Sequence, residues 1–235
     1  MTTCTPVSLH VTLRFESGLH IGTGFGIAKL LDERTMQGPH PKTIGGTIPY
    51  VPGSSLKGRL RAKATSLVAT LFPSEDEETC KARNEMIIDL FGAHLTPESP
   101  PRPGERRAGR LVFADAHLSE QDAVTITEHK GALLPYLALE RRTHVALSRE
   151  RRSAKEDMLM TIEVASPGLH LETMIEGWLP AAQAMRETAL LVLAICATTH
   201  LGGHKGRGLG AVQMVPTRIR VGNEDVSLDT LREAL

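Results

Sequence analysis

Hydrophobic and polar positions alternate near the start of the chain. Over residues 7–15, VSLHVTLRF, apolar side chains occupy every second position. A period of two is typical of a β-strand that is buried on one face. The pattern stops at residues 17–26, where four glycines favour a loop. The irregular stretch 27–50 predicts a long loop, and long loops in compact domains commonly carry function.

Other segments have the spacing of helices. Over residues 53–72, apolar side chains recur on one helical face, beside two stripes of basic residues. Ser54 or Ser55 is expected to cap this helix by accepting from its free N–H groups. Residues 182–199 are strongly apolar and predict a helix packed deep against a sheet, and a shorter helix is expected at 84–91.

Further strands complete the order of elements. They are expected at residues 109–118, 160–164, 169–175 and 211–221. The second and third of these flank Ser166-Pro167-Gly168, which predicts a hairpin-like turn. The resulting order is strand, helix, strand, strand, strand, helix, strand. Helices segregated on one antiparallel sheet indicate an α+β fold, and a ferredoxin-like βαββαβ core with inserted loops fits this order.

Composition excludes several classes of protein. The 235 residues are 41% hydrophobic, too many for a disordered chain, and 27 basic side chains balance 27 acidic ones. Zero net charge argues against coating nucleic acid by bulk attraction, and only eight aromatic residues argue against a base-stacking platform. No apolar run reaches the ~18 residues of a membrane span, and no secretory signal is visible, so a cytoplasmic location is expected.

Cysteine and histidine spacing predicts no metal site. The three cysteines, Cys4, Cys80 and Cys196, are odd in number and far apart, unlike a disulfide framework or a zinc motif. The ten histidines include no HExxH motif and no close pair at helical ligand spacing. A structural metal ion is therefore not expected from the sequence.

Two segments combine cations with exposed backbone N–H groups. Residues 201–210, LGGHKGRGLG, place Lys205 and Arg207 among five glycines. Such a loop can approach a phosphodiester closely because it has few Cβ atoms, and this interpretation is favoured over a flexible connector. Residues 52–61, PGSSLKGRLR, start a helix whose N-terminus attracts anions. An ordinary capped surface helix explains the second segment equally well.

A third basic segment spans residues 141–155. It holds six basic side chains against the single acid Glu150, enough for several phosphate contacts if they face the other basic loops. The cluster of Arg149, Arg151, Arg152 and Lys155 could form the tip of a protruding hairpin, although charge runs commonly form a solvated face. In the loop after the first strand, Asp32 could position a metal ion or a reacting hydroxyl, but composition alone favours a solvated carboxylate.

Three of these motifs together resemble a known superfamily. GLHIGTG, IPYVPGSSLKGRLR and LGGHKGRGLG occur in the order found in the RAMP proteins of CRISPR-Cas systems. Within that superfamily the chain is similar to the backbone subunit of type III effector complexes. The resemblance implies a modified RRM-like fold with an inserted β-hairpin, or thumb. It also implies one RAMP domain over residues 1–235, with insertions at about 17–50, 72–108 and 119–158.

The resemblance also implies an activity and partners. Copies of such a subunit stack along a guide RNA beside other type III subunits, without a membrane, and cleave the target RNA at regular intervals. Asp32 is the matching catalytic acid and metal ligand for a divalent cation, expected to be Mg²⁺, and its neighbour Glu33 could substitute for it. The residues expected at RNA are His20, Ser54, Ser55, Lys57, Arg61, Arg142, His144, Arg149, Arg151, Arg152, Gly203, His204, Lys205, Gly206 and Arg207.

Two alternatives stay open at this point. The chain could be a purely structural RNA-binding subunit in which Asp32 is inert. It could instead be a stand-alone endoribonuclease that trims precursor RNA, which calls for a general base such as His20 or His204. A small-molecule enzyme is the least favoured class because no cofactor motif is present.

Overall fold

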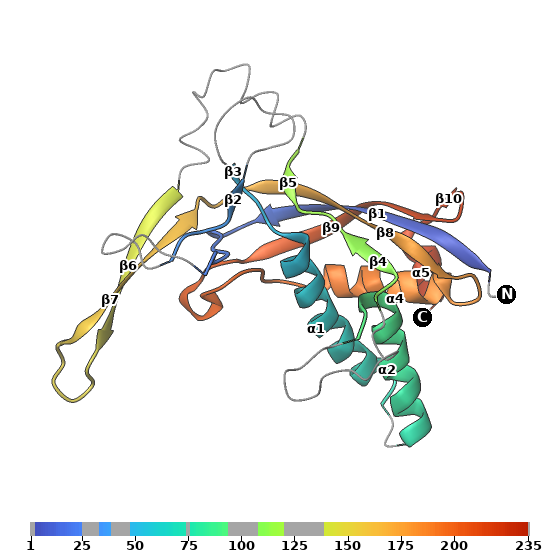
Figure 1. The fold of residues 1–235 in the computed structure, drawn as a ribbon, viewed down its shortest axis with the longest axis horizontal. Coiled ribbons are helices and arrows are strands. Elements are labelled where there is room, and N and C mark those ends of the chain that lie inside the picture. Colours follow the sequence, from blue (N-terminus) through green and yellow to red (C-terminus); the bar gives the residue numbers. More distant parts are fainter. Residues whose placement is uncertain are drawn as a thin grey trace, which may run out of the picture.

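The part of the chain that the structure describes forms a body of sheet and helices and a hairpin that projects from it (Figure 1). The computed structural model describes residues 3–24, 33–38, 48–73, 76–93, 108–119 and 139–234. The main sheet has the strand order β10-β9-β1-β8-β4, and β5 also pairs with β8. These strands are β1 (Cys4–Phe15), β4 (Leu111–Phe113), β5 (His117–Leu118), β8 (His170–Pro180), β9 (Val212–Val221) and β10 (Glu224–Asp225).

The strand directions are those of a ferredoxin-like sheet. Both β1 and β4 are antiparallel to β8, which lies between them, so β1 and β4 run parallel to one another. Helices α1 (Gly53–Leu71) and α2 (Glu77–Phe91) connect β1 to this side of the sheet, and α4 (Ala184–Cys196) connects β8 to β9. The two crossovers and the order β9-β1-β8-β4 confirm the α+β, ferredoxin-like prediction.

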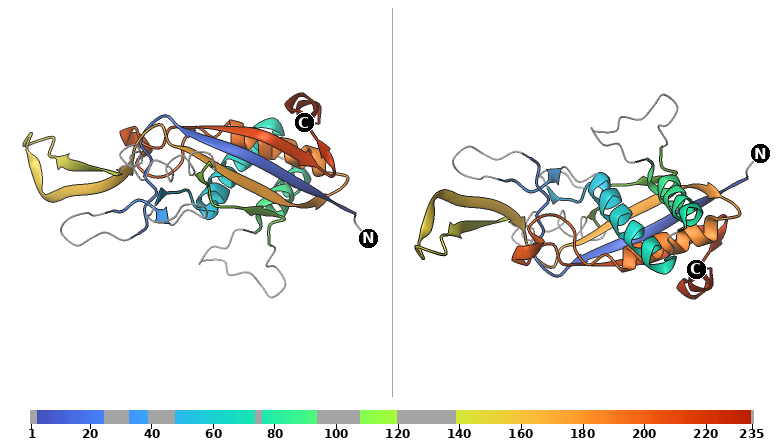
Figure 2. Two further views of the ribbon diagram at one scale, coloured as in Figure 1. Left: turned by 90° about the horizontal axis from the view of Figure 1, so that it is seen from above. Right: turned by 90° about the horizontal axis from the view of Figure 1, so that it is seen from below.

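The core lies between the sheet and the helices. The alternating residues of β1 that face inward, from Val7 to Phe15, are at most 3% exposed, so the period of two is confirmed. They pack against apolar side chains such as Leu60 of α1 and Leu191 of α4, which are fully buried. Figure 2 shows the helices together on one face of the sheet and the strands uncovered on the other.

A separate two-stranded sheet projects from the body. Strand β6 (Leu139–Leu147) pairs antiparallel with β7 (Ala154–Ala165), and this hairpin is called the thumb (Figure 1). It confirms the protruding hairpin predicted from the basic run. The hairpin-like turn expected at residues 166–168 does not join two paired strands, since β7 pairs with β6 and β8 lies between β1 and β4. The intervening turn is instead held at the end of β1, where Phe15 N–H donates to the Leu169 carbonyl at 2.9 Å.

The predicted serine cap of α1 is also wrong. Ser54 and Ser55 are exposed and give no side-chain capping bond. The N–H of Gly53 donates instead to Oδ1 of Asp115 at 2.7 Å. A Cβ atom on Gly53 would lie 2.0 Å from the carbonyl oxygen of Phe113, so the first turn packs tightly against the chain that leaves β4.

Two other predictions need new boundaries. The helix expected at 84–91 begins earlier, at Glu77, because the side chain of Asp76 accepts the N–H of Thr79 at 3.0 Å. The strand expected at 109–118 is divided into β4 and β5, both paired with β8. Between them the hydroxyl of Thr173 donates to the carbonyl of Ala114 at 2.7 Å.

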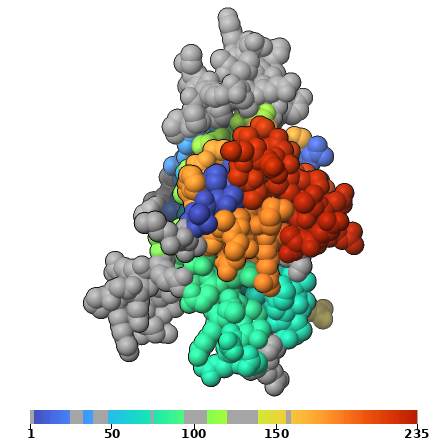
Figure 3. All heavy atoms as spheres, turned by 90° about the vertical axis from the view of Figure 1, so that its right-hand side faces the viewer, coloured from blue at the N-terminus to red at the C-terminus, as the bar shows by residue number. Residues whose placement is uncertain are grey.

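The end of the molecule opposite the thumb carries both ends of the chain (Figure 3). The C-terminal helix α5 (Leu228–Glu233) packs there against α4. The short pair β2 (Gln37–Gly38) and β3 (Ile48–Pro49) lies instead on the thumb side of the molecule (Figure 1). In the described part of the chain, no helix has the length and hydropathy to cross a membrane.

Candidate functional site at the base of the thumb

Three separate segments of the chain meet at the base of the thumb. They are the loop after β1, residues 33–36 and the glycine-rich loop 201–210. On one side, Glu163 of β7 donates its N–H to the Glu33 carbonyl at 3.0 Å. On the other side, Met36 N–H donates to the Ile21 carbonyl at 2.8 Å. Residues 33–36 thus join the thumb to the body in the manner of a short strand.

The glycine-rich loop docks on the loop after β1. The N–H of Gly203 donates to the His20 carbonyl at 2.8 Å, and Gly210 N–H donates to the Gly18 carbonyl at 2.9 Å. Gly202 has a φ of 82°, and a Cβ atom there would lie 2.2 Å from the His20 carbonyl oxygen. Part of the glycine pattern therefore serves backbone-to-backbone packing. Gly206, in contrast, faces open space, where a ligand can approach.

His20 has a defined hydrogen-bonding state. Its side chain is 1% exposed, and Nδ1 lies 2.6 Å from the backbone carbonyl oxygen of Glu163. A carbonyl only accepts, so Nδ1 carries the hydrogen and donates it. The other ring nitrogen, Nε2, lies 3.0 Å from Oε2 of Glu33.

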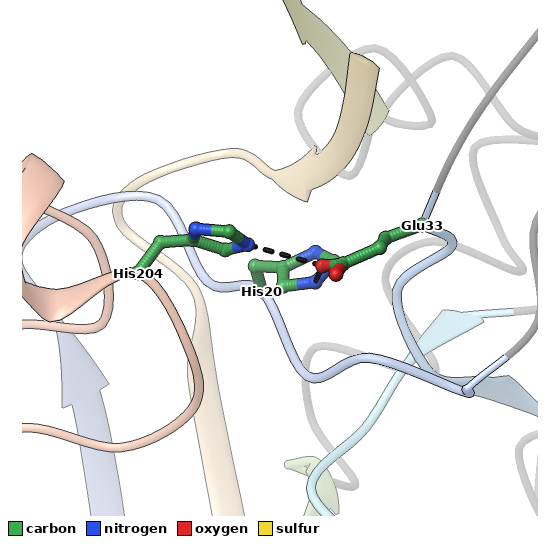
Figure 4. Close-up of side chains that lie close together, drawn as sticks. All are labelled: His20, Glu33 and His204. Carbon is green, nitrogen blue, oxygen red and sulfur yellow. Dashed lines mark hydrogen bonds and ion pairs between the residues drawn. The ribbon is translucent and has the colours of Figure 1, made fainter. Parts of the chain in front are cut away.

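His204 completes a three-residue cluster around one oxygen (Figure 4). Its Nε2 lies 3.0 Å from the same Oε2 of Glu33, and its ring centroid is 5.1 Å from that of His20. The hydrogen bond from His204 lowers the pKa of Glu33, burial opposes this effect, and the hydrogen bond from His20 lowers the pKa further. Glu33 is therefore a carboxylate at neutral pH.

A third histidine lies next to the cluster. The ring of His144, on β6, stacks with that of His204 at a centroid distance of 6.4 Å. Burial lowers the pKa of His144, and the charges of Arg207, His204 and Arg142 lower it further, so the ring is neutral at neutral pH. Among the described residues, its Nε2 is one of the buried side-chain atoms without a hydrogen-bond partner.

The His20, Glu33 and His204 cluster has the composition of a metal site. Its three ligand atoms all lie within 4.8 Å of one another. Sequence spacing predicted no such site, because Glu33 is 13 residues from His20 and 171 residues from His204. Both histidines were expected at RNA, but nothing in the local pattern indicated that they share a carboxylate. Glu163, which orients His20, was missed entirely.

The residues predicted for RNA binding fall into three groups. His20, Arg142, His144, Gly203, His204, Lys205, Gly206 and Arg207 lie at the base of the thumb or on the loop that reaches it. Arg149, Arg151 and Arg152 lie at the thumb tip, exposed. Ser54, Ser55, Lys57 and Arg61 belong to α1. Asp32, the predicted catalytic residue and metal ligand, lies outside the described residues, immediately before Glu33 in sequence.

Internal partners occupy part of the predicted binding surface on α1. At the start of the helix, where the sequence predicted a bound anion, the carboxylate of Asp115 accepts the hydrogen bond from the Gly53 N–H. Arg61 donates from its guanidinium to the Gly92 carbonyl at the end of α2. Ser54 and Ser55 remain exposed and Lys57 is half-buried.

Comparison with solved structures indicates the same fold in CRISPR complexes. A chain of the type III-B Cmr-beta complex in its apo state has a TM-score of 0.53 at 12% identity, covering 92% of this chain and 98% of that one. A chain of the Cmr-beta complex bound to cognate target RNA has a TM-score of 0.52 at 12% identity, with 99% of each chain covered. At this identity the likeness concerns the fold alone.

Comparison with curated proteins and family models is more specific. The CRISPR system Cms endoribonuclease Csm3 of Streptococcus thermophilus is 30% identical over 116 residues, which are 49% of this chain and 46% of that protein. The Csm3 endoribonuclease of Mycobacterium tuberculosis is 26% identical over 249 residues, covering 97% of this chain and 94% of that protein. The model of the RAMP superfamily matches residues 12–213. Since that match covers most of the chain, this protein belongs to the RAMP superfamily.

Proposed function

We propose that this protein is a guide-RNA-binding backbone subunit of a type III CRISPR ribonucleoprotein that cleaves complementary target RNA at regular intervals. The observation that carries this proposal is the likeness, over 97% of the chain, to a protein named as a Csm3 endoribonuclease. Residues 1–235 are proposed to form one RAMP domain. Its partners are guide RNA, target RNA, further copies of itself and other type III subunits, assembled in the cytoplasm.

Guide binding is proposed to involve the backbone of the RNA rather than its bases. The loop 201–210 presents Lys205 and Arg207 beside Gly206, with space for a phosphate to approach. Arg142 lies at the base of the thumb, and further arginines lie at its tip. Such contacts are sequence-independent, which suits a protein that leaves sequence reading to a guide RNA.

Asp32 is the proposed catalytic residue. The thumb would splay one target nucleotide, and Asp32 would then help its 2′-hydroxyl lose a proton and attack the adjacent phosphorus. The P–O5′ bond breaks and the leaving oxygen takes up a proton, which yields a cyclic phosphate and a free 5′-hydroxyl. In-line positioning of this kind supplies about 7–11 kcal/mol at best. A divalent cation, with Mg²⁺ proposed, would stabilise negative charge on the phosphate oxygens when bound.

The decisive experiment uses the complex purified with its guide RNA and a labelled complementary RNA. Wild-type complex is expected to cut the target with Mg²⁺ and to lose activity with EDTA. Asp32→Ala should abolish cleavage while assembly and target binding stay intact, and Asp229→Ala, an exposed carboxylate on α5, serves as the matched control. Undiminished cleavage by Asp32→Ala would remove this residue from the mechanism.

The two alternatives predict different results in the same assay. A purely structural subunit leaves target RNA uncut in the wild-type complex. A stand-alone processing enzyme cuts precursor RNA as an isolated chain, without partners. Purification of the complex without any RNA would contradict the proposed function as a whole.

A further inference from the structure

We infer that His20, Glu33 and His204 form a binding site for one divalent transition-metal cation, which ties the glycine-rich loop to the base of the thumb. The three ligands do not include Asp32, which lies outside the described residues and to which a cation was assigned under the proposed function. The inference does not depend on RNA cleavage. The names of the similar proteins and complexes mention no such metal site. Its ligands come from the three segments that meet at the thumb (Figure 4).

The distances suit an ion at the centre of the cluster. Oε2 of Glu33 lies 3.0 Å from Nε2 of both histidines, and the three atoms span at most 4.8 Å. Ligand bonds of about 2.0–2.1 Å in tetrahedral geometry hold neighbouring ligand atoms about 3.3 Å apart. Closing the cluster around an ion therefore needs side-chain movements of roughly 1 Å or less.

The orientation of His20 is that of a metal ligand. Because its Nδ1 donates to the Glu163 carbonyl, a neutral His20 directs the lone pair of Nε2 at Oε2 of Glu33. Two electron pairs that face each other at 3.0 Å need a proton or a cation between them. A backbone carbonyl that fixes the second ring nitrogen is typical of metal-bound histidine, and the 1% exposure of His20 prevents the ring from turning into solvent.

The chemistry of the ligands selects the class of cation. Two imidazoles and one carboxylate suit zinc, manganese, iron, cobalt or nickel, whereas magnesium prefers oxygen ligands throughout. The side chain of Glu33 is 44% exposed and that of His204 17% exposed. The outer side of the cluster is thus open to solvent, where water or a phosphate oxygen could complete the coordination.

Arg207 opposes metal binding in this site. Its Nη1 lies 3.4 Å from Nδ1 of His204, and because arginine only donates, Nδ1 accepts and the ring hydrogen of His204 sits on Nε2. A metal ion must displace that hydrogen and tolerate the nearby guanidinium charge. Replacing Arg207 by glutamine should therefore strengthen metal binding, a result that a simple ion-pair cluster does not predict.

The test uses full-length, tag-free protein stripped with EDTA and titrated separately with zinc, manganese and magnesium chloride by calorimetry. One equivalent of zinc or manganese is expected to bind, without comparable magnesium binding. Zinc at 100 times its Kd should raise the Tm by about 5–10 °C. Glu33→Gln and His204→Ala should each weaken binding at least tenfold, whereas Arg207→Gln should strengthen it.

Matched controls separate this site from adventitious binding. His170→Ala removes an exposed histidine on β8, and Asp229→Ala removes an exposed carboxylate on α5; both should bind zinc as the wild type does. Equal zinc affinity in all variants, or no binding by the wild type, would overturn the inference. Should Glu33→Gln or His204→Ala fail to fold, anomalous diffraction at the zinc edge from wild-type crystals decides. A peak among the three side chains supports the site, and a peak only elsewhere, or none, refutes it.

Discussion

Oδ1 of Asp115 accepts the backbone N–H of Gly53 at 2.7 Å and so caps helix α1 from 62 residues away. The first N–H groups of a helix have no partner within the helix, and a side-chain oxygen that takes one of them stabilises the helix. The neighbouring bridge between Val51 and Ala116 holds the two segments together. A loop after β4 thereby determines where α1 begins.

Removing this cap should destabilise the protein although no core residue changes. Asp115→Ala is expected to lower the free energy of unfolding by about 1 kcal/mol, or the Tm by about 2–4 °C. Ser54→Ala and Ser55→Ala, at the positions where the sequence predicted the cap, should change the Tm little because both side chains are exposed without a capping bond. Thermal melts of the three variants check this, and a larger loss in a serine variant would contradict the assignment.

The two ends of the glycine-rich loop should differ in their tolerance of a methyl group. Gly202→Ala puts a Cβ atom 2.2 Å from the His20 carbonyl oxygen, at a φ of 82° that disfavours side chains. We expect a loss of more than about 1 kcal/mol in the free energy of unfolding. Gly206→Ala meets nothing within 4 Å and should fold as the wild type does. Denaturant titration of both variants measures the difference, and equal stability would show that the loop does not dock as described.

Glu187 should make the stability depend on pH. Burial, reinforced by the charge of Asp89 and opposed by Arg110, raises the pKa of Glu187 from 4.5 to about 7. Between these values the folded state binds more protons than the unfolded state, so stability falls as the pH rises from about 4.5 to 7. Among the described residues, Oε2 of Glu187 is one of the buried atoms without a hydrogen-bond partner.

Glu187→Gln removes this carboxylate while keeping its shape. At pH 8 the variant should be more stable than the wild type by about 1–2 kcal/mol, because a buried unsatisfied charge is lost. At pH 5, where the wild-type group is protonated, the difference should largely vanish. Denaturant titrations at both pH values test this. Glu233→Gln, at the end of α5, is the control, and a parallel pH profile for Glu187→Gln and the wild type would rule the effect out.

The thumb tip should contribute electrostatically to RNA binding. Replacing Arg149, Arg151 and Arg152 by alanine removes three exposed cations. Each phosphate contact on a single strand contributes about 0.7 to the slope of log K against log salt concentration, so the magnitude of this slope should fall by about 2. Fluorescence anisotropy with single-stranded RNA at several salt concentrations gives this slope. Replacing Lys81, Arg218 and Arg220, which lie off the thumb, removes the same charge and should change the slope little. Equal losses in both triple variants would mean that net charge alone governs binding.

Local pattern was sufficient for most of the secondary structure. The alternation over β1 reflects a strand that is buried on one face, and the apolar run over α4 reflects a helix that is buried along most of its length. Both elements are buried in this way, so the spacing of their apolar residues was enough to predict them. The order of these elements was enough to predict the ferredoxin-like sheet, because two helical crossovers on one antiparallel sheet leave few alternatives.

Contacts between distant segments could not be read in the same way. Nothing near Gly53 indicates that Asp115 caps it, and the sequence of β7 alone does not state that it pairs with β6 rather than β8. Both depend on where the chain returns after a long connection.

The spacing of neighbouring residues was enough to predict the long strands of the main sheet, the main helices, the sheet class and the basic, glycine-rich segments. The folded chain was needed to show that His20 and His204 contact the same oxygen of Glu33, and that some glycines allow two loops to pack together. A site made by residues on three segments has no period and no local motif. It exists only once packing has brought those segments to the base of the thumb.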